Sequence, residues 1–138
     1  MLYIQQNAIG AVLFFENHKT QTEKPPISII KLLCLEMLTT YEARNQITKQ
    51  RFKLNTLIPI YINSSVLLMP TGSPRNYETV WINYLKIASF QKYGTKTVVL
   101  FTNLDEIEVD ISYTRFKEKM KSCKIIYDYM DKVQTQIF

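Results

Sequence analysis

The sequence predicts an α+β fold, mainly antiparallel β-sheet with one amphipathic helix after the N-terminal strands and one C-terminal helix. Two windows have apolar residues at helical spacing, one near each end of the chain, and short apolar runs separated by turn residues fill the rest. A chain of 138 residues, 46% of them hydrophobic, can bury the core of one domain. We therefore expect residues 1–138 to form a single domain.

Two short strands are expected at the N-terminus. They cover residues 2–6 and 9–15, which are apolar runs on either side of a turn at Asn7-Ala8. The polar stretch that follows, residues 16–24, has no apolar pattern and is expected to form a loop. It ends in Pro25-Pro26, which is typical of a loop that opens a helix, because proline suits the first helical turn.

The spacing of apolar residues predicts the first helix. From Ile30 to Leu38 these residues recur at positions i, i+3, i+4, i+7 and i+8, which places them on one face of a helix. We expect an amphipathic helix over residues 27–42. The basic stretch after it, residues 44–55, lacks this periodicity and is expected to be a loop or an irregular strand.

The middle of the chain is predicted to be a series of strands joined by turns. Two apolar runs, residues 57–62 and 66–69, flank Asn63-Ser64 and indicate a hairpin. Residues 70–75 contain two prolines and a glycine, so regular structure is not expected there. Three further strands are expected to form an antiparallel meander, over residues 79–91, 96–102 and 106–112.

A second helix is expected after Ser112, whose side chain is a good N-cap. Six apolar or aromatic residues then alternate spacings of three and four, so they share one face of the helix. They are Tyr113, Phe116, Met120, Cys123, Tyr127 and Met130. A stripe of this kind most often covers a sheet, and a dimer seam is the alternative.

Basic residues are concentrated in the middle of the chain. Residues 43–103 contain eight basic side chains and one acid, Glu78, whereas the whole chain has a net charge of +5. An acidic run from Asp105 to Asp110 follows at once. Segregated charge favours a surface that binds a polyanion, because neutralised phosphates release counterions. A solvated basic face without a partner explains the same distribution equally well.

Residues suited to catalysis or metal binding are sparse. His18 is the single histidine, and the three glycines are isolated, which excludes a glycine-rich phosphate loop. Cys34 and Cys123 are far apart and outside any C-x-x-C pattern, so we expect both to be small buried hydrophobic residues. We predict that the chain is not an enzyme and takes no cofactor or metal.

The sequence contains no predicted membrane span or secretion signal. Its longest apolar runs, such as residues 65–70, are far shorter than the roughly 18 residues that a membrane span needs. The N-terminus has no basic segment and no small-residue cleavage site. We therefore expect a cytoplasmic protein without a membrane partner.

Groups that bind nucleic acid are better represented. Guanidinium, ammonium and amide groups gather in the basic stretch 44–55, and one more arginine lies in the constrained loop 70–75. Such groups suit phosphates and the acceptor-rich floor of a DNA minor groove. The candidate DNA-binding residues are Arg44, Asn45, Lys49, Arg51, Lys53 and Arg75. Trp81 lies in a predicted strand and is expected to be a core residue rather than a contact.

Several short motifs occur in a distinctive order and spacing. They are Cys34, Tyr41-Glu42-Ala43-Arg44, Ile58-Pro59-Ile60, Met69-Pro70-Thr71, Ser73, Arg75, Val80-Trp81-Ile82, and Ile111-Ser112-Tyr113 with Phe116. Together they resemble the ComK family of competence transcription factors, whose signature reads PPI, FPT-x-S, WI and ISY-x-x-F. The likeness spans about residues 30–120.

The resemblance implies an activator of competence, or DNA-uptake, genes that recognises AT-rich promoter boxes through minor-groove and phosphate contacts. It implies double-stranded DNA as a partner, a homo-oligomer or pairing with a related regulator, and control by an adaptor and a Clp-type protease. Arg44 matches the basic turn of the family, whereas Asn45 stands where the family tends to have a basic residue.

By the same resemblance the chain is expected to be a short and divergent member. The part before the first helix is shorter than in the family, and little sequence follows the final helix. The alternative function is that of a truncated ComK paralogue, a protein-interaction module that modulates another regulator through the helix of residues 113–130 without strong DNA binding. RNA binding, by base stacking on some of the nine tyrosines, is a third and weaker alternative.

Overall fold

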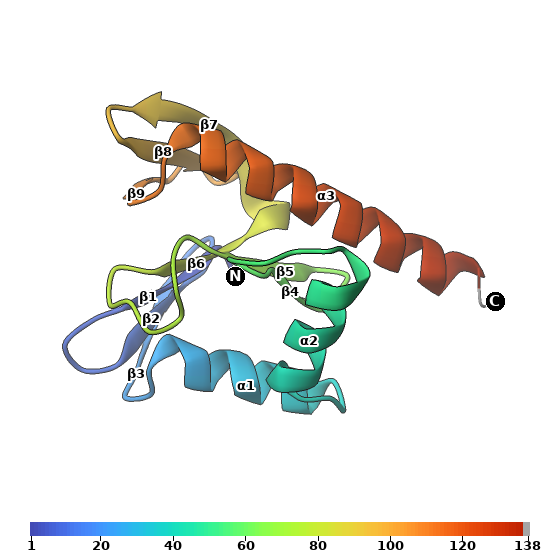
Figure 1. The fold of residues 1–138 in the computed structure, drawn as a ribbon. Coiled ribbons are helices and arrows are strands. Elements are labelled where there is room, and N and C mark those ends of the chain that lie inside the picture. Colours follow the sequence, from blue (N-terminus) through green and yellow to red (C-terminus); the bar gives the residue numbers. More distant parts are fainter. Residues whose placement is uncertain (137–138) are drawn as a thin grey trace.

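The computed structural model describes residues 1–136 and confirms the α+β class. In chain order the elements are β1 (Tyr3–Gln6), β2 (Ala11–Phe14), β3 (Lys19–Thr22), α1 (Pro26–Glu36), α2 (Tyr41–Arg51), β4 (Ile60–Asn63), β5 (Val66–Pro70), β6 (Val80–Asn83), the 3₁₀ turn η1 (Tyr84–Lys86), β7 (Ile87–Tyr93), β8 (Lys96–Phe101), β9 (Glu106–Val109) and α3 (Tyr113–Gln136). A six-stranded sheet lies between α1 on one side and a layer of α3 with a three-stranded sheet on the other (Figure 1). α2 contacts α1 and the edge strand β4.

The six-stranded sheet is antiparallel, with the strand order β3-β2-β1-β6-β5-β4. β1 pairs with β6, so Ile4 stands opposite Trp81, and the N-terminal strands join those from the middle of the chain. Side chains alternate between the two faces of a sheet, so neighbours in β6 enter different cores. Trp81 packs on the α1 side and Ile82 on the α3 side, and both are buried. The expectation that Trp81 is a core residue is confirmed.

The two cysteines lie in these two different cores. Cys34 belongs to the core under α1 and Cys123 to the core under α3, and both are fully buried. Burial raises the pKa of each thiol, which keeps it protonated. Both are therefore small buried hydrophobic residues, as expected.

The apolar stripe of α3 covers the sheets of its own chain. Phe116 and Cys123 are fully buried, and Met120, Tyr127 and Met130 pack around the same core. The stripe is therefore part of the core, which is the commoner of its two interpretations. The predicted cap is also confirmed, because Ser112 Oγ accepts a hydrogen bond from Arg115 N at 3.3 Å.

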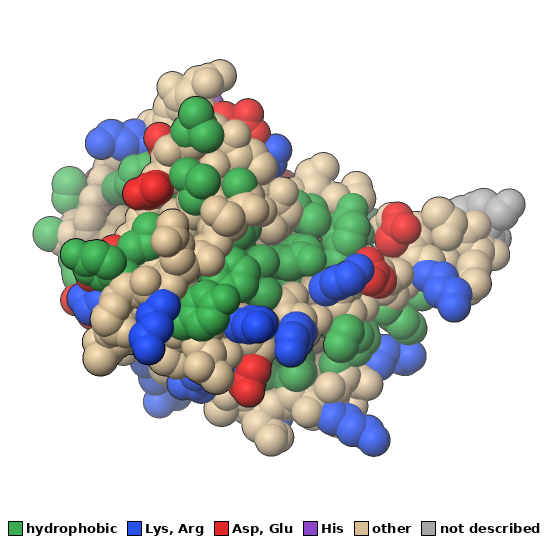
Figure 2. Space-filling view, turned by 90° about the horizontal axis from the view of Figure 1, so that it is seen from above, with side chains coloured by type: hydrophobic (Ala, Val, Ile, Leu, Met, Phe, Trp, Pro, Cys, Tyr) green, Lys and Arg blue, Asp and Glu red, His purple; other side chains and the backbone are tan. Residues whose placement is uncertain are grey.

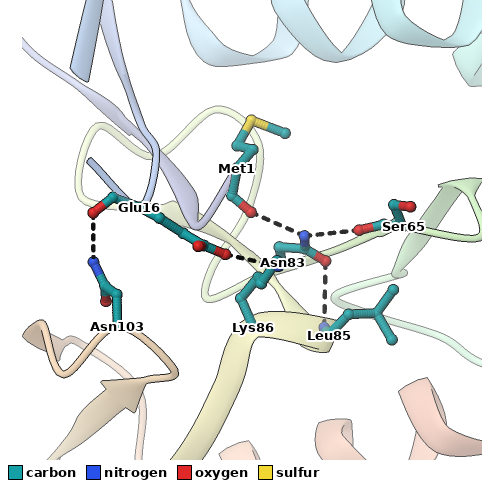
Figure 3. Close-up of polar contacts among 7 residues, drawn as sticks. All are labelled: Met1, Glu16, Ser65, Asn83, Leu85, Lys86 and Asn103. Carbon is teal, nitrogen blue, oxygen red and sulfur yellow. Dashed lines mark hydrogen bonds and ion pairs between the residues drawn. The ribbon is translucent and has the colours of Figure 1, made fainter. Parts of the chain in front are cut away.

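The chain crosses from the large sheet to the small one between β6 and β7. The single strand expected over residues 79–91 is wrong, because η1 divides it into two strands of different sheets. Asn83, fully buried, fixes this crossing (Figure 3). Its Nδ2 donates to the carbonyl oxygens of Met1 at 2.9 Å and Ser65 at 3.1 Å, and its Oδ1 accepts from Leu85 N at 3.3 Å. One amide side chain thus satisfies backbone groups from three segments.

A second set of contacts joins the two sheets beside this crossing. Lys86 Nζ donates to Glu16 Oε1 at 2.8 Å, and Asn103 Nδ2 donates to the carbonyl oxygen of Glu16 at 3.1 Å (Figure 3). The turn after β2 therefore holds both η1 and the β8–β9 turn. These contacts fix the small sheet relative to the large one.

The helical region after the N-terminal strands contains two helices rather than one. The helix expected to reach residue 42 ends at Glu36, and Leu38 then takes a left-handed backbone with φ 62°. Thr40 caps α2, because its Oγ1 accepts a hydrogen bond from Ala43 N at 3.1 Å. The loop or irregular strand expected over residues 44–55 is wrong, since most of it is helical. Apolar periodicity could not reveal α2, because none of its residues is buried.

The remaining strand predictions are largely confirmed. The β1–β2 hairpin, the β4–β5 hairpin and the β7–β8–β9 meander all form. The loop expected over residues 16–24 is wrong, because it contains β3, which pairs with β2 at the edge of the sheet. β3 is mostly exposed, so its sequence carries no apolar alternation.

Candidate nucleic-acid interface

A groove of about 650 Å³ opens between α2, the linker that follows it, and the loop between β5 and β6. α2 contributes Asn45 and Lys49 to its lining. The loop contributes residues 70–74 and Asn76, which stand on both sides of Arg75. The structure therefore brings the basic helix and the Arg75 loop, which are separate in the sequence, to one surface.

One side of α2 carries three of the predicted site residues. Asn45, Lys49 and Lys53 are spaced four residues apart and follow one another along the helix and just past its end. Lys49 borders both the groove and a neighbouring hollow of about 520 Å³, and Lys53 borders that hollow. Both lysines are exposed. We call Lys49 and Lys53 together the lysine face of α2. Their exposed ammonium groups can bind an anion.

Two other predicted site residues, Arg44 and Arg51, lie on a different side of α2. Arg44 Nη1 donates to the carbonyl oxygen of Tyr61 in β4, and its guanidinium lies 5.8 Å from the centroid of that tyrosine ring. Arg51 Nη1 donates to the Tyr129 hydroxyl at 2.9 Å, and its guanidinium lies 5.3 Å from that ring centroid. Both arginines line a pocket of about 310 Å³ that also has α3 residues in its wall. The structure does not bring them to the groove.

The loop that carries Arg75 is held by its own hydrogen bonds. Thr79 Oγ1 donates to the carbonyl oxygen of Ser73 at 2.6 Å, and Thr71 Oγ1 accepts from the first backbone N–H of β6 at 2.9 Å. A side chain at position 72 would crowd this bond, because a Cβ there would lie 2.7 Å from Thr79 Oγ1. Arg75 is exposed. The loop therefore presents its guanidinium from a fixed backbone.

The linker between α2 and β4 is fixed by α3. Lys53 and Leu57 have left-handed backbones, with φ 55° and 51°, which bulky residues adopt only when their surroundings impose it. Between them, Thr56 is held twice. Its carbonyl oxygen accepts from Lys119 Nζ at 2.6 Å, and its Oγ1 accepts from Arg115 Nη2 at 3.1 Å. Burial, and then the charge of Arg115, lowers the pKa of Lys119.

Sequence reasoning missed both Lys119 and Arg115. Lys119 lies three residues after Phe116 and four before Cys123, so helical spacing places it on the buried side of α3. That spacing was the available signal. Arg115 borders the groove but lies outside the basic stretch, and its position in the sequence carries no comparable signal.

The lining of the groove carries both signs of charge. Its basic residues are Lys49 and Arg115, and its acidic residue is Asp110. The face over α3 and the small sheet differs, because there Lys and Arg side chains are scattered among acidic and apolar ones (Figure 2). A continuous basic patch is not visible on that face. The lysine face of α2 and the adjoining groove are therefore the better candidate for polyanion binding.

Other kinds of site find little support in residues 1–136. His18 is exposed and stacks on Phe15, with ring centroids 4.6 Å apart. Within the described residues, His, Cys, Asp and Glu side chains form no group of three or more that could hold a metal ion. No helix in this part of the chain is long and apolar enough to cross a membrane.

Comparison with known proteins gives one match. The model of a family described as ComK protein matches residues 2–135. No curated protein and no solved structure matches the chain.

Proposed function

The chain belongs to the ComK family of competence transcription factors, and from this premise we propose that it binds AT-rich promoter DNA and activates DNA-uptake genes. The family is one of transcription factors rather than of enzymes. Binding is proposed to use phosphate contacts and contacts in the minor groove. The proposal includes a cytoplasmic location, because a bacterial transcription regulator acts where the chromosome lies.

The observation that carries this proposal is the meeting of α2 and the Arg75 loop at one groove, where Lys49 lies in the lining and Arg75 lies in the loop that borders it. Phosphate oxygens accept hydrogen bonds from lysine, arginine, asparagine and hydroxyl groups, and all of these occur on α2 and in the Arg75 loop. Gln46 and Gln50 border the neighbouring hollow and add amide groups, which can donate to the N3 and O2 acceptors that A·T pairs present in the minor groove. The surface therefore has the chemistry for both kinds of contact.

We assign two roles to the predicted site residues. Those on the groove, its loop or the lysine face contact DNA: Asn45, Lys49, Lys53 and Arg75. Arg44 and Arg51 position α2 instead, because each is engaged with a tyrosine of another element. Within one short segment, some residues are thus assigned to contact DNA and others to hold α2 in position.

The test is a binding titration of the full chain against two duplexes of equal length, one AT-rich and one GC-rich. We expect tighter binding of the AT-rich duplex and a steep fall in affinity between about 50 and 200 mM salt, because each neutralised phosphate adds roughly 0.9 to the slope of log K against log salt. Fluorescence anisotropy measures both quantities. A flat salt response, or equal affinity for the two duplexes, contradicts the proposal, and so does a preference for single-stranded RNA in competition.

Protein partners form a separate part of the proposal. We propose that the chain assembles with a second copy or a related regulator, and that an adaptor delivers it to a Clp-type protease. The exposed side of α1 and the turn after it support a protein contact, because Leu32, Leu35 and Leu38 are 43%, 56% and 97% exposed. Sedimentation of the chain with and without the duplex tests the assembly, and a monomer under both conditions contradicts it.

The alternative of a protein-interaction module without strong DNA binding has less support. It places the partner on the helix of residues 113–130, and the apolar stripe of that helix packs on the core of its own chain. Size exclusion and pull-down without DNA separate the two functions, since only the module predicts a tight protein partner in the absence of nucleic acid.

A further inference from the structure

We propose that the groove holds the sugar–phosphate backbone of one strand of the bound duplex, and that Arg115 of α3 is a phosphate contact there alongside Lys49 of α2. The inference rests on the proposed function and deepens it. It adds a contact from a helix that is far from the basic stretch in the sequence, and it names the sugar–phosphate backbone as the ligand of the groove.

The size of the groove limits its occupant. A volume of about 650 Å³ falls within the roughly 300–1,000 Å³ of sites that hold small molecules, so a whole duplex does not enter it. A short stretch of one backbone does, while the rest of the duplex lies over α2 and the Arg75 loop. Successive charges along one strand are about 3.4 Å apart along the duplex axis, so even a short stretch brings more than one phosphate near the lining.

The polar lining of the groove suits a phosphodiester more than a base. Its side-chain amides come from three different segments, namely Asn45, Asn55 and Asn76, and hydroxyl groups come from Thr71 and Ser73. These groups donate hydrogen bonds to phosphate and sugar oxygens without regard to sequence. The lining thus positions DNA, and sequence preference comes from the surface outside the groove.

Arg115 keeps free donors beside its bond to the linker. One N–H of its guanidinium donates to Thr56 Oγ1 at 3.1 Å, while the residue as a whole is exposed and borders the groove. A guanidinium has five N–H donors in a planar fork, so a single bond to Thr56 leaves a pair for the two oxygens of a phosphate. Among the described residues, no carboxylate forms an ion pair with Arg115.

The charge balance of the groove makes Arg115 decisive. Its ionised lining residues are Lys49, Arg115 and Asp110, two cations and one acid. Without Arg115 the lining has one of each sign, so its net positive charge is lost. A lysine elsewhere on α3, such as Lys117, leaves this balance unchanged when it is removed.

Three variants test the inference with the same AT-rich duplex. Arg115→Gln removes the proposed contact, and Lys117→Gln is the matched control, since it removes one charge from an exposed residue in the same part of α3. Thr56→Val removes the bond between Arg115 and the linker and keeps the charge of Arg115. Thermal unfolding of each variant shows whether the linker and α3 remain folded.

We expect Arg115→Gln to weaken binding about 5- to 20-fold near 100 mM salt and to reduce the salt slope by about one unit. Lys117→Gln and Thr56→Val should each change affinity less than about twofold. The inference is overturned if Arg115→Gln weakens binding no more than Lys117→Gln does. It is also overturned if Thr56→Val reproduces the loss, because Arg115 would then act only by holding the linker. A wild-type chain that does not bind the duplex defeats the proposed function as well, whereas normal binding by Arg115→Gln defeats this inference alone.

Discussion

The two sides of α2 carry the same charge and differ in what they contact. Lys49 and Lys53 are exposed and border hollows on the surface. Arg44 and Arg51, in the same segment, bond to the backbone of β4 and to a tyrosine of α3. One side of the helix is open to a polyanion, and the other attaches the helix to the rest of the fold.

The difference follows from the chemistry of the two cations. A guanidinium is planar and weakly hydrated, so it can donate to a carbonyl and lie against an aromatic ring at the same time. An ammonium group is a compact, strongly hydrated charge on a flexible stem. α2 has no buried residue, so its arginines attach it to the rest of the fold, which an apolar face does in other helices. A count of basic residues therefore overstates the charge that is free to meet DNA.

The largest effect is expected from removing the lysine face. In the double variant Lys49→Gln/Lys53→Gln, affinity for an AT-rich duplex should fall about 10- to 100-fold and the salt slope by about two units, because each lysine neutralises about one phosphate. Lys117→Gln/Lys121→Gln removes the same charge from exposed positions on α3 and is the control. Anisotropy titrations at several salt concentrations measure both. Equal losses in the two variants would mean that net charge, rather than this side of α2, sets the affinity.

Arg44→Met should act first on stability. β4 is an edge strand, and Arg44 supplies a donor to the carbonyl oxygen of Tyr61 within it. Loss of the donor leaves a partly buried acceptor unpaired, so we expect the free energy of unfolding to fall by about 1–2 kcal/mol. The melting temperature should fall by roughly 3–8 °C. Chemical and thermal denaturation measure these quantities.

DNA binding by the same variant distinguishes support from contact. Measured well below the melting temperature, the affinity of Arg44→Met should fall less than that of the double lysine variant. A loss as large as that of the double variant, with an unchanged melting temperature, would make Arg44 a DNA contact rather than a positioning residue.

The parts of the fold that could be predicted are those with a repeating buried pattern. The stripe of α3 and the apolar strands of the two hairpins and the meander show their burial directly in the sequence. α2 and β3 have few or no buried residues and therefore no pattern to detect. The crossing at Asn83 was missed for another reason: its hydrogen bonds reach Met1, 82 residues away, so no local window contains them.

The candidate site was predictable in composition and not in arrangement. The basic residues were identified from their density in the chain, but what separates Arg51 from Lys53 is a bond to Tyr129, 78 residues away. Arg115 reaches the groove through a contact that spans 59 residues. Such pairings are products of tertiary packing, and a single sequence holds no local signal for them.

The acid in the groove should give a smaller effect of the opposite sign. Asp110 is exposed and borders the groove, where it repels a phosphate backbone. We expect Asp110→Asn to tighten binding of the AT-rich duplex about two- to fivefold at low salt, with less gain at high salt because exposed charges are screened. Glu106→Gln, on an exposed residue of β9, makes the same change of charge elsewhere. If it tightens binding as much, the effect is long-range and Asp110 has no special place in the groove.

The smallest effect is expected from Tyr129→Phe, which locates the boundary between the two sides of α2. The substitution removes the hydroxyl that Arg51 bonds at 2.9 Å and keeps the ring under the guanidinium. The pair is exposed, so the free energy of unfolding should change by no more than about 0.5 kcal/mol, and DNA affinity should not change. If Arg51 is instead a DNA contact that Tyr129 restrains, Tyr129→Phe will tighten binding and Arg51→Gln will weaken it. If affinity is unchanged in both variants, Arg51 is a positioning residue. At the C-terminal end of α2, the surface that contacts DNA then includes Lys53 and not Arg51.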